Sequence, residues 1–547
     1  MHKTAYAFGG RGILAFITAT VVCWAWCSSQ PQAAGTLAGS TLNVTANELP
    51  ISLAHSVVLA LQNNMEVKVE RLTPLIREEE VRREAGAFFA PRLNVEVSTD
   101  RSQRPAGSVL AGAQVANTEN IDVNTGVSTR STTGGVVSLD FRNKRFETNS
   151  AFQLFDPQYT AELALTLTHP LLKNFGVSIN KVRIKVSQNN MTISKYQLQA
   201  TVMSLVATVQ QTYWDLVFAA NDLATRRRSL EVAQHLQRRT EEMVHQSRLP
   251  AIALLQAKTA VLEREIDVVA GVNAFEDAQA RLKALLNLEK VLPAAEYTLV
   301  PTDLPVQEST IVSVSEGLKS AMEKRPELFQ ARLDQENRLL GRQFAQNQRL
   351  PELNFVGSIG LSGLAGTPTS TALTTLTVGG IPVVNFLPDG QSPESFDGGY
   401  TDALGKLFSG NLLSYKVGLS LQIPLGNEIA RSELAKARVE VEKSKMTLEV
   451  LEQNLRLEVE GVARGVNSRL KTIEGARALR DLVSRKLAMA QEGLELGVSS
   501  VTDVLEAQKN LSVAQRDELK TVIEYNKMLT LWDKTTGVVL ERFHIEL

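Results

Sequence analysis

Two hydrophobic patterns alternate along the chain. In four short segments apolar and polar residues alternate one by one, which is the period of a β-strand with one apolar and one polar face. These segments centre on residues 93–100, 163–168, 353–362 and 415–423. In two much longer segments apolar residues recur every three or four positions, which is the seam of a coiled coil. The second pattern is clearest at Leu198, Val202, Leu205, Val209, Tyr213 and Leu216, and again at Leu448, Leu451, Leu455, Val459, Val462 and Val466.

The coiled-coil patterns predict two unusually long helices. One runs from about Ile179 to Gln246, a length of ~100 Å at 1.5 Å per residue, turns at Arg248–Pro250 and returns to about Leu288. The other turns at Gly497–Ser500 and returns to about Trp532. Because helices of globular proteins average about 11–12 residues, each long helix must lie against other helices along its length.

Sequence landmarks recur in the same order in the two halves of the chain. The run Ala90-Pro91-Arg92-Leu93-Asn94 corresponds to Leu350-Pro351-Glu352-Leu353-Asn354, and Leu254-Leu255-Gln256-Ala257 corresponds to Val504-Leu505-Glu506-Ala507. The order predicts a tandem duplication over residues 51–290 and 313–537, each half built as helix, strand, loop, strand, long helix, turn and helix. The proline-rich segment 291–312 is interpreted as a linker, and 538–547 as a C-terminal tail.

The loops inside the two strand pairs, Arg101–Gln158 and Gly363–Ser414, are long and rich in Ser, Thr, Gly and Asn. An extra hairpin around Val136–Phe141 is the alternative to a plain loop in the first of them. In the second, Asp397–Asp402 lacks the number of ligands that a calcium loop needs, so a plain loop is favoured.

The N-terminus has the pattern of an export signal. Basic residues precede an apolar run from Ile13 to Trp26, and Ala33-Ala34-Gly35 suits a signal peptidase, so we expect a signal peptide over 1–35 and a short tail over 36–50. Both cysteines, Cys23 and Cys27, fall inside this segment, which leaves the mature chain without thiol chemistry. Lipidation of Cys27 is the alternative, although the residues before it do not match a lipobox.

Composition and motifs exclude several function classes. The formal net charge is -1, so nothing indicates a nucleic-acid partner. The histidines show no metal-ligand spacing, and there is no phosphate-binding glycine loop or nucleophile elbow. We therefore expect no cofactor, no metal and no enzymatic activity.

Four amphipathic strands are too few to close a barrel, which takes about eight or more. An open edge is costly in lipid because each unpaired backbone group costs several kcal/mol, so strands in a membrane would require several chains to share one barrel, and three chains would give twelve strands. Four prolines mark the junctions between strands and helices and are expected to act as structural corners. They are Pro91, Pro170, Pro351 and Pro424.

The ordered, duplicated motifs make the chain resemble the TolC-type outer membrane factor family. The most specific are Leu496–Ser500 with Asp503–Gln508, Gln211–Leu216 with Ser229–Ala233, and the Pro-x-Leu-Asn starts of strands at Pro91 and Pro351. The resemblance implies an α+β membrane protein: a homotrimer whose chains each give four strands to a twelve-stranded β-barrel in the outer membrane, above a periplasmic α-helical tunnel. It further implies a passive exit duct of a tripartite efflux pump or type I secretion system. Its partners would be outer membrane lipid, a periplasmic adaptor and an inner membrane transporter. An exported coiled-coil protein that spaces envelope layers or adheres to surfaces is the alternative.

The second helical turn carries the candidate site. Gly497 can end the long helix with a positive φ, and Ser499 or Ser500 can cap the returning helix, whose positive end suits Asp503. Asp503 and Glu506 are three residues apart and share one helix face. The resemblance implies that they form carboxylate rings that bind cations at the duct's inner constriction. It also implies that Leu496, Gly497, Val498, Ser499 and Ser500 contact the adaptor. The first turn has no glycine, and Ala253 stands where Asp503 stands in the second.

Overall fold

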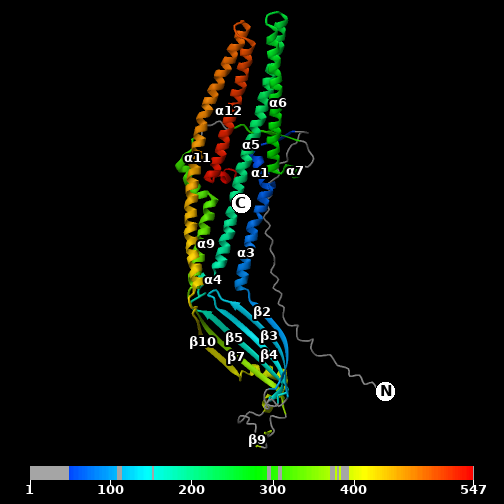
Figure 1. The fold of residues 1–547 in the computed structure, drawn as a ribbon, viewed down its shortest axis with the longest axis vertical. Helices are drawn as coiled ribbons and strands as arrows, with labels where there is room; N and C mark the ends of the chain where they lie inside the picture. Colours follow the sequence, from blue (N-terminus) through cyan, green and yellow to red (C-terminus); the bar gives the residue numbers. More distant parts are fainter. Residues whose placement is uncertain are drawn as a thin grey trace, which may run out of the picture.

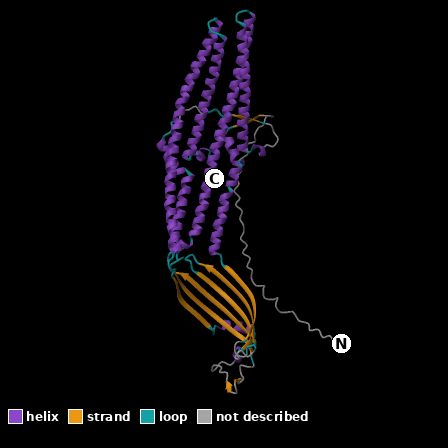
Figure 2. Ribbon diagram, in the orientation of Figure 1, coloured by secondary structure: helices purple, strands orange, loops and turns teal. Residues whose placement is uncertain are grey.

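The computed structural model describes residues 48–106, 114–150, 153–291, 297–305, 311–369, 376–378, 381–383 and 393–545. The expected signal peptide, with Cys23 and Cys27, lies outside the described residues, as do parts of the expected linker. The molecule is elongated, with long, nearly parallel helices at one end and a single large sheet at the other (Figures 1 and 2).

Two long helical hairpins form most of the helical layer. The first joins α5 (Val182–His245) to α6 (Ala251–Leu286), and the second joins α11 (Glu428–Glu495) to α12 (Val501–Thr536). The long arms have 64 and 68 residues, which gives each a length of about 100 Å. Both hairpins agree with the sequence prediction. In the half near the sheet, α3 (Leu72–Phe89) packs on α5, and α9 (Pro326–Gln348) packs on both α5 and α11.

Shorter elements surround the middle of the long helices (Figure 1). Strand β1 (Glu48–Ile51) pairs in parallel with β6 (Thr298–Pro301), so the end of the predicted N-terminal tail meets the predicted linker between the two repeats. The largest hydrophobic core lies here and includes the fully buried Tyr213. The remaining helices nearby are α1 (Leu53–Asn63), α2 (Met65–Glu70), α7 (Leu288–Val291), α8 (Val314–Lys324) and α13 (Val539–Arg542).

The sheet has six strands, not the four that the sequence analysis predicted. Its order is β10-β7-β5-β4-β3-β2, and every pairing is antiparallel. The strands are β2 (Arg92–Pro105), β3 (Val115–Arg130), β4 (Val136–Thr148), β5 (Phe155–Pro170), β7 (Glu352–Pro368) and β10 (Leu413–Gln422).

The correction concerns the segment Arg101–Gln158, which was predicted as a long loop with an extra hairpin as the alternative. The structure forms that hairpin as β3 and β4, much longer than the alternation around Val136–Phe141 suggested. The signal was weak because β3, VANTENIDVNTGVSTR, carries Asn, Thr and Glu at many positions of both faces. Its backbone is paired with β2 on one side and β4 on the other, and these hydrogen bonds do not depend on apolar side chains.

The second predicted loop, Gly363–Ser414, is also partly structured. It contains the short pair β8 (Leu376–Val378) and β9 (Ile381–Val383), the 3₁₀ turn Pro393–Phe396, and α10 (Tyr400–Ser409), which packs on β5 and β7. The acid that had suggested calcium caps this helix, because the Asp402 carboxylate accepts a hydrogen bond of 2.8 Å from the Gly399 backbone N–H. The Asp397–Asp402 segment is thus the start of a helix.

Cross-strand register gives the sheet one apolar and one polar face. Along one row, Leu93, Val127, Leu139, Leu165, Ile359 and Tyr415 lie side by side from β2 to β10. The next row, on the opposite face, carries Asn94, Gly126, Asp140, Ala164, Gly360 and Ser414. The strands therefore separate an apolar environment from a polar one.

The junction between sheet and helices contains the four prolines. Pro91 lies directly before β2, Pro170 ends β5, Pro351 lies between α9 and β7, and Pro424 lies between β10 and α11. In both predicted repeats a helix leads into strands of the large sheet, and a long helix and its returning helix follow. The first repeat gives this sheet four strands and the second gives it two, and the boundaries of the repeats stay a prediction. Within the part of the chain that the structure describes, no helix is both long and apolar enough to span a bilayer.

Candidate functional site at the helix tips

The second tip, between α11 and α12, is closed by backbone hydrogen bonds around Gly497. The Gly497 N–H donates to the Leu494 carbonyl at 3.2 Å, and the Val498 N–H donates to the Gly493 carbonyl at 2.9 Å. Gly497 has φ of 78°, a left-handed conformation that a side chain would strain. The sequence placed this glycine at the end of the long helix, and the structure gives it that position.

Asp503 forms a capping box with Ser500 at the start of α12. The Asp503 N–H donates to Ser500 Oγ at 3.2 Å, while Asp503 Oδ2 accepts from the Ser500 hydroxyl at 2.7 Å and from its backbone N–H at 2.8 Å. These two donors, with a smaller contribution from Lys486, hold the pKa of Asp503 below its ordinary value. Asp503 is therefore a helix-capping residue that also stays ionised at the tip.

Glu506 lies one turn further along α12 and is exposed. It lines a groove of about 470 Å³ between α12 and α6, with Leu505 and Lys509 on one side and Leu255 and Gln256 on the other. Asp503 is not among the residues that line this groove. The two acids are both exposed, but in the single chain only Glu506 faces the groove between the hairpins.

The first tip is built differently. Ser247 takes φ of 57°, the conformation that Gly497 provides in the second tip, and Pro250 precedes α6 where Ser500 precedes α12. Ala253 is buried and its N–H donates to the Pro250 carbonyl at 3.0 Å. The first tip thus has no acid that corresponds to Asp503.

The two tips contact each other within one chain. A small hydrophobic cluster joins them, formed by Leu236, Ala253, Leu494, Val501 and Val504. The Thr502 hydroxyl donates to Gln256 Oε1 at 3.1 Å, and Arg239 Nη2 lies 2.9 Å from Glu495 Oε1.

A buried ion-pair cluster joins the hairpins further from the tip. Asp222 of α5 has a side chain only 7% exposed, and its Oδ2 accepts from Arg226 Nε at 2.8 Å. Arg516 Nε of α12 lies 3.4 Å from Asp222 Oδ1. Arg226 also donates to the Asp267 carbonyl of α6 at 2.9 Å, so the Asp222–Arg226 pair connects three helices. Sequence analysis missed this cluster; the i,i+4 pair Asp222 and Arg226 is visible in sequence, but its distant partner Arg516 is not.

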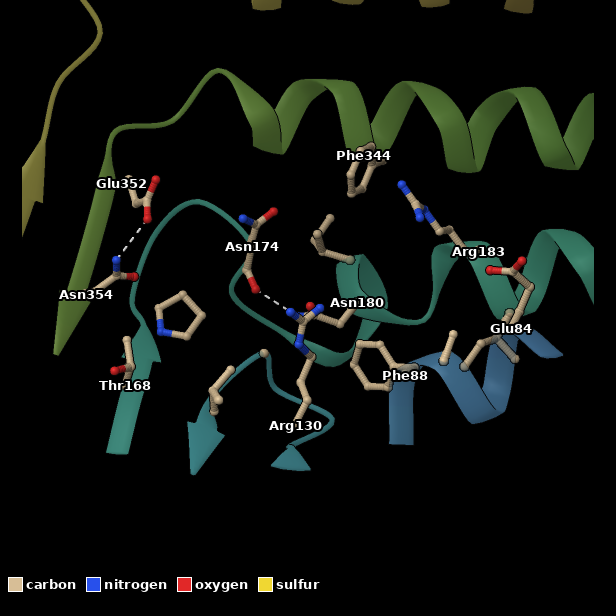
Figure 3. A pocket seen from close by; sticks show the side chains of 16 residues that line it. Glu84, Phe88, Arg130, Thr168, Asn174, Asn180, Arg183, Phe344, Glu352 and Asn354 are labelled. Atoms are coloured by element: carbon tan, nitrogen blue, oxygen red, sulfur yellow. Dashed lines mark hydrogen bonds between the residues drawn. The ribbon is translucent and has the colours of Figure 1, made fainter. Parts of the chain in front are cut away.

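A second cavity, of about 400 Å³, lies where the sheet meets the helices (Figure 3). Phe88 and Glu84 enter it from α3, Arg130 from the end of β3, and Arg183 from α5. Asn180 Nδ2 donates to the Asn174 carbonyl at 2.7 Å, and Asn354 Nδ2 donates to Glu352 Oε1 at 3.0 Å on its wall. Residues around the β3–β4 turn, which lies beneath α3 and α5, form part of the wall of this cavity. A prediction with four strands could therefore not include the cavity.

Part of the second half of the chain matches a known family model. Residues 317–522, from α8 into α12, match the family model described as outer membrane efflux protein. No curated protein matches the sequence. The resemblance to the TolC-type outer membrane factor family is confirmed.

Solved outer membrane factor channels have the same fold. The outer-membrane channel OprN is 14% identical, covers 89% of each chain and has a TM-score of 0.62. The Campylobacter jejuni CmeC channel is 15% identical over 89% of this chain and 85% of its own, with a TM-score of 0.59. The Neisseria gonorrhoeae MtrE channel in its open state is 15% identical over 94% and 99%, with a TM-score of 0.56.

These matches agree with the predicted outer membrane location. The proteins of the matched family are channels and not enzymes. Among the described residues, no three His, Cys, Asp or Glu side chains are grouped as a metal site requires.

Proposed function

We propose that three copies of the chain form a passive exit duct of a tripartite efflux pump or type I secretion system in the outer membrane. The observation that carries this proposal is the two-faced sheet with two open edges, joined at one end to helical hairpins about 100 Å long. Such a sheet cannot stand alone in lipid, because its edge strands would leave backbone groups without hydrogen-bond partners.

Exposure of the apolar face supports contact with outer membrane lipid. Val97 on β2 and Val417 on β10 are both 70% exposed, and Leu93 and Leu419 are nearly as open. Contiguous apolar surface of more than a few hundred Å² is rare on proteins surrounded by water. The polar face, with Asp140 and Ser414, would then line the duct.

The second tip is proposed as the docking site for a periplasmic adaptor, which would connect the duct to an inner membrane transporter. Leu496 is 72% exposed and Val498 is 81% exposed, and both lie in a turn that backbone hydrogen bonds hold in place. Exposed apolar side chains on a fixed backbone suit a protein partner, since little conformational entropy is lost on binding. A photocrosslinker at Val498 should capture the adaptor. The same crosslinker at Val439, equally apolar and on the shaft of α11, should not; equal capture at both positions would contradict docking at the tip.

Asp503 and Glu506 are proposed to form the cation-binding ring at the duct's inner mouth. Both side chains are exposed, and threefold symmetry would repeat each acid around the axis. We expect the double variant Asp503→Asn, Glu506→Gln to lose cation block and cation selectivity in a planar bilayer. Asparagine still offers an oxygen to the capping box, so the fold should persist.

The matched control for the ring is Glu474→Gln with Asp481→Asn. It removes two charges from α11 at least four helical turns from the tip. If both double variants change cation block equally, general electrostatics and not a ring at the tip would explain the effect.

Gating is proposed to occur by separation of the α11–α12 hairpin from the α5–α6 hairpin at the tips. The contacts that would break are Thr502 with Gln256, Arg239 with Glu495, and Arg516 with Asp222. The gate thus depends on a few polar contacts and one small hydrophobic cluster, which moderate forces from a docked partner could disrupt.

Electron microscopy of the detergent-solubilised protein from an outer membrane fraction tests the proposal as a whole. Threefold particles with a compact end and a tapering stalk of about 100 Å are expected. Single thin rods from the soluble fraction would instead support an exported coiled-coil structural or adhesive protein.

A further inference from the structure

We propose that the duct wall is an eighteen-stranded closed sheet, in which β2 of each copy pairs with β10 of the next. This inference rests on the proposed trimeric duct and departs from the twelve strands that the family resemblance implies. Each copy contributes six strands to one continuous sheet, and three copies therefore supply eighteen.

The β3–β4 hairpin is an integral part of the wall. β3 pairs with β2 from Arg92 to Pro105, and β4 pairs with β5 from Val136 to Phe146. In the described sheet β2 and β5 are not neighbours, since the hairpin separates them. Removing the hairpin from the wall would break both of these ladders.

The hairpin also faces the same two environments as the other strands. Val123, Val127, Val137 and Leu139 continue the apolar face, and each is at least 36% exposed. Asn124, Ser128 and Asp140 continue the polar face. A segment folded into the lumen would have no reason to keep an exposed apolar face in register with lipid-facing neighbours.

The turn of the hairpin is fixed beneath the helices (Figure 3). The Gly176 N–H donates to the Thr133 carbonyl at 3.1 Å, and the Arg130 guanidinium lies 5.8 Å from the centre of the Phe88 ring. Gly134 has φ of 103°, and a Cβ there would come within 2.5 Å of the Asn174 carbonyl oxygen. The hairpin is thus packed into the junction between α3 and α5.

The two edge strands are complementary in direction. β2 runs away from the helices, since it follows α3, whereas β10 runs toward them, since it precedes α11. Copies placed side by side at the same height therefore present an antiparallel pair of edges. Antiparallel pairing is also the only kind found within this sheet, so the new seam continues its pattern.

Side chains of the two edges match in one register. When the helix-proximal ends of β2 and β10 are placed at the same height, Leu421 lies opposite Leu93, Leu419 opposite Val95, and Val417 opposite Val97. On the polar face this register places Lys416 diagonally between Glu96 and Asp100, where opposite charges attract. The occupant of each open edge is therefore a second copy of this chain.

The strand number determines the width of the duct. At about 4.8 Å between strands and about 40° tilt, eighteen strands give a ring about 36 Å across, against about 24 Å for twelve. A ring of this perimeter is compatible with the helical layer, since each copy brings α3, α5, α9 and α11 to the junction and neighbouring helices lie about 8–10 Å apart. The wall is thus expected to be about one and a half times wider than a twelve-stranded one.

A disulfide across the seam tests the pairing. The only cysteines of the sequence are Cys23 and Cys27, so Val97→Cys with Val417→Cys introduces the only pair beyond the expected signal peptide. Within one copy these positions lie on opposite edges of the sheet, roughly 24 Å apart, so only neighbouring copies can join. After oxidation in the membrane we expect covalent dimers and trimers and nothing larger. Val97→Cys with Ile359→Cys, a mid-sheet position on the same face, is the control and should stay monomeric under denaturing conditions.

Electron microscopy of the same oxidised protein separates the outcomes. The inference is supported if the particles are threefold, carry the seam crosslink and have a ring whose diameter is about one and a half times that of a twelve-stranded ring. Threefold particles that have a narrow ring, or that fail to crosslink, would overturn it and leave the duct proposal standing. Particles without a ring would refute the duct proposal itself.

Discussion

The substitution Asp222→Asn tests whether the buried ion-pair cluster holds the tips together. In the structure the Asp222 carboxylate lies between Arg226 of its own helix and Arg516 of α12. Asparagine has the same shape but no charge. Its oxygen can still accept from Arg226, which leaves its NH₂ group facing the Arg516 guanidinium, a donor facing a donor.

The loss of stability in Asp222→Asn depends on which partners the two arginines keep. Arg226 is 17% exposed and keeps its hydrogen bond to the Asp267 carbonyl, so it does not become an isolated buried charge. Arg516 is 49% exposed and can turn to water. The loss is therefore that of one ion pair with a half-exposed arginine, about 2 kcal/mol, and not the 3–5 kcal/mol of a fully buried bridge. If opening separates α12 from α5, a change of about 2 kcal/mol shifts the balance between closed and open tips about thirtyfold.

Single-channel recording in a planar bilayer measures this balance as the fraction of time spent at high conductance. Asp517→Asn is the matched control, because it removes the same charge from the exposed neighbour of Arg516 and should change stability by less than about 0.5 kcal/mol. We expect frequent opening in Asp222→Asn only. Equal open fractions in the two variants would show that the cluster stabilises the chain without restraining the gate.

Three further predictions concern packing, pH and capping. Gly317→Ala should lower stability by about 1–3 kcal/mol in thermal unfolding, because its Cβ would lie 2.1 Å from the Trp532 ring; no change in Tm would mean that α8 shifts freely. Burial, together with the neighbouring Asp303 carboxylate, raises the pKa of Tyr213 to about 12, so its contribution to stability is complete below pH ~10 and should be lost as pH rises toward 12. When unfolding is measured as a function of pH, Tyr213→Phe should lose less stability between pH ~10 and 12 than the unsubstituted chain. Identical pH profiles of the two chains would exclude the phenol as the cause. Ser500→Ala should cost about 1 kcal/mol and increase amide hydrogen exchange at the start of α12, whereas Ser499→Ala, outside the capping box, should not.

The parts of the fold that sequence could predict are those with strong local periodicity. The long hairpins were predicted because apolar residues recur every three or four positions within α5 and α11, and the turn at Gly497 because a glycine, two serines and an acid fall at capping positions. Strands β2, β5, β7 and β10 were predicted because their alternation is strict.

The parts that sequence missed depend on partners far along the chain. β3 is paired on both sides, so its polar sequence still forms a strand, and nothing local reveals that. The cluster at Asp222 needs Arg516, nearly 300 residues later in the chain, and the groove at Glu506 needs α6 beside α12. Periodicity identifies the face that a residue occupies, but not the residue that it meets.

The β3–β4 hairpin constrains how a wall of this kind can evolve. Each strand takes the chain from one end of the sheet to the other. A single added strand would therefore start α5 at the end of the sheet that is far from the other helices, away from α11. Only even insertions preserve the direction of everything that follows. In a threefold assembly every such insertion is copied three times, and the circumference can change only in steps of six strands. The width of the proposed duct would therefore change only in discrete steps, and the smallest change that alters it would be an added hairpin and not a gradual drift in sequence.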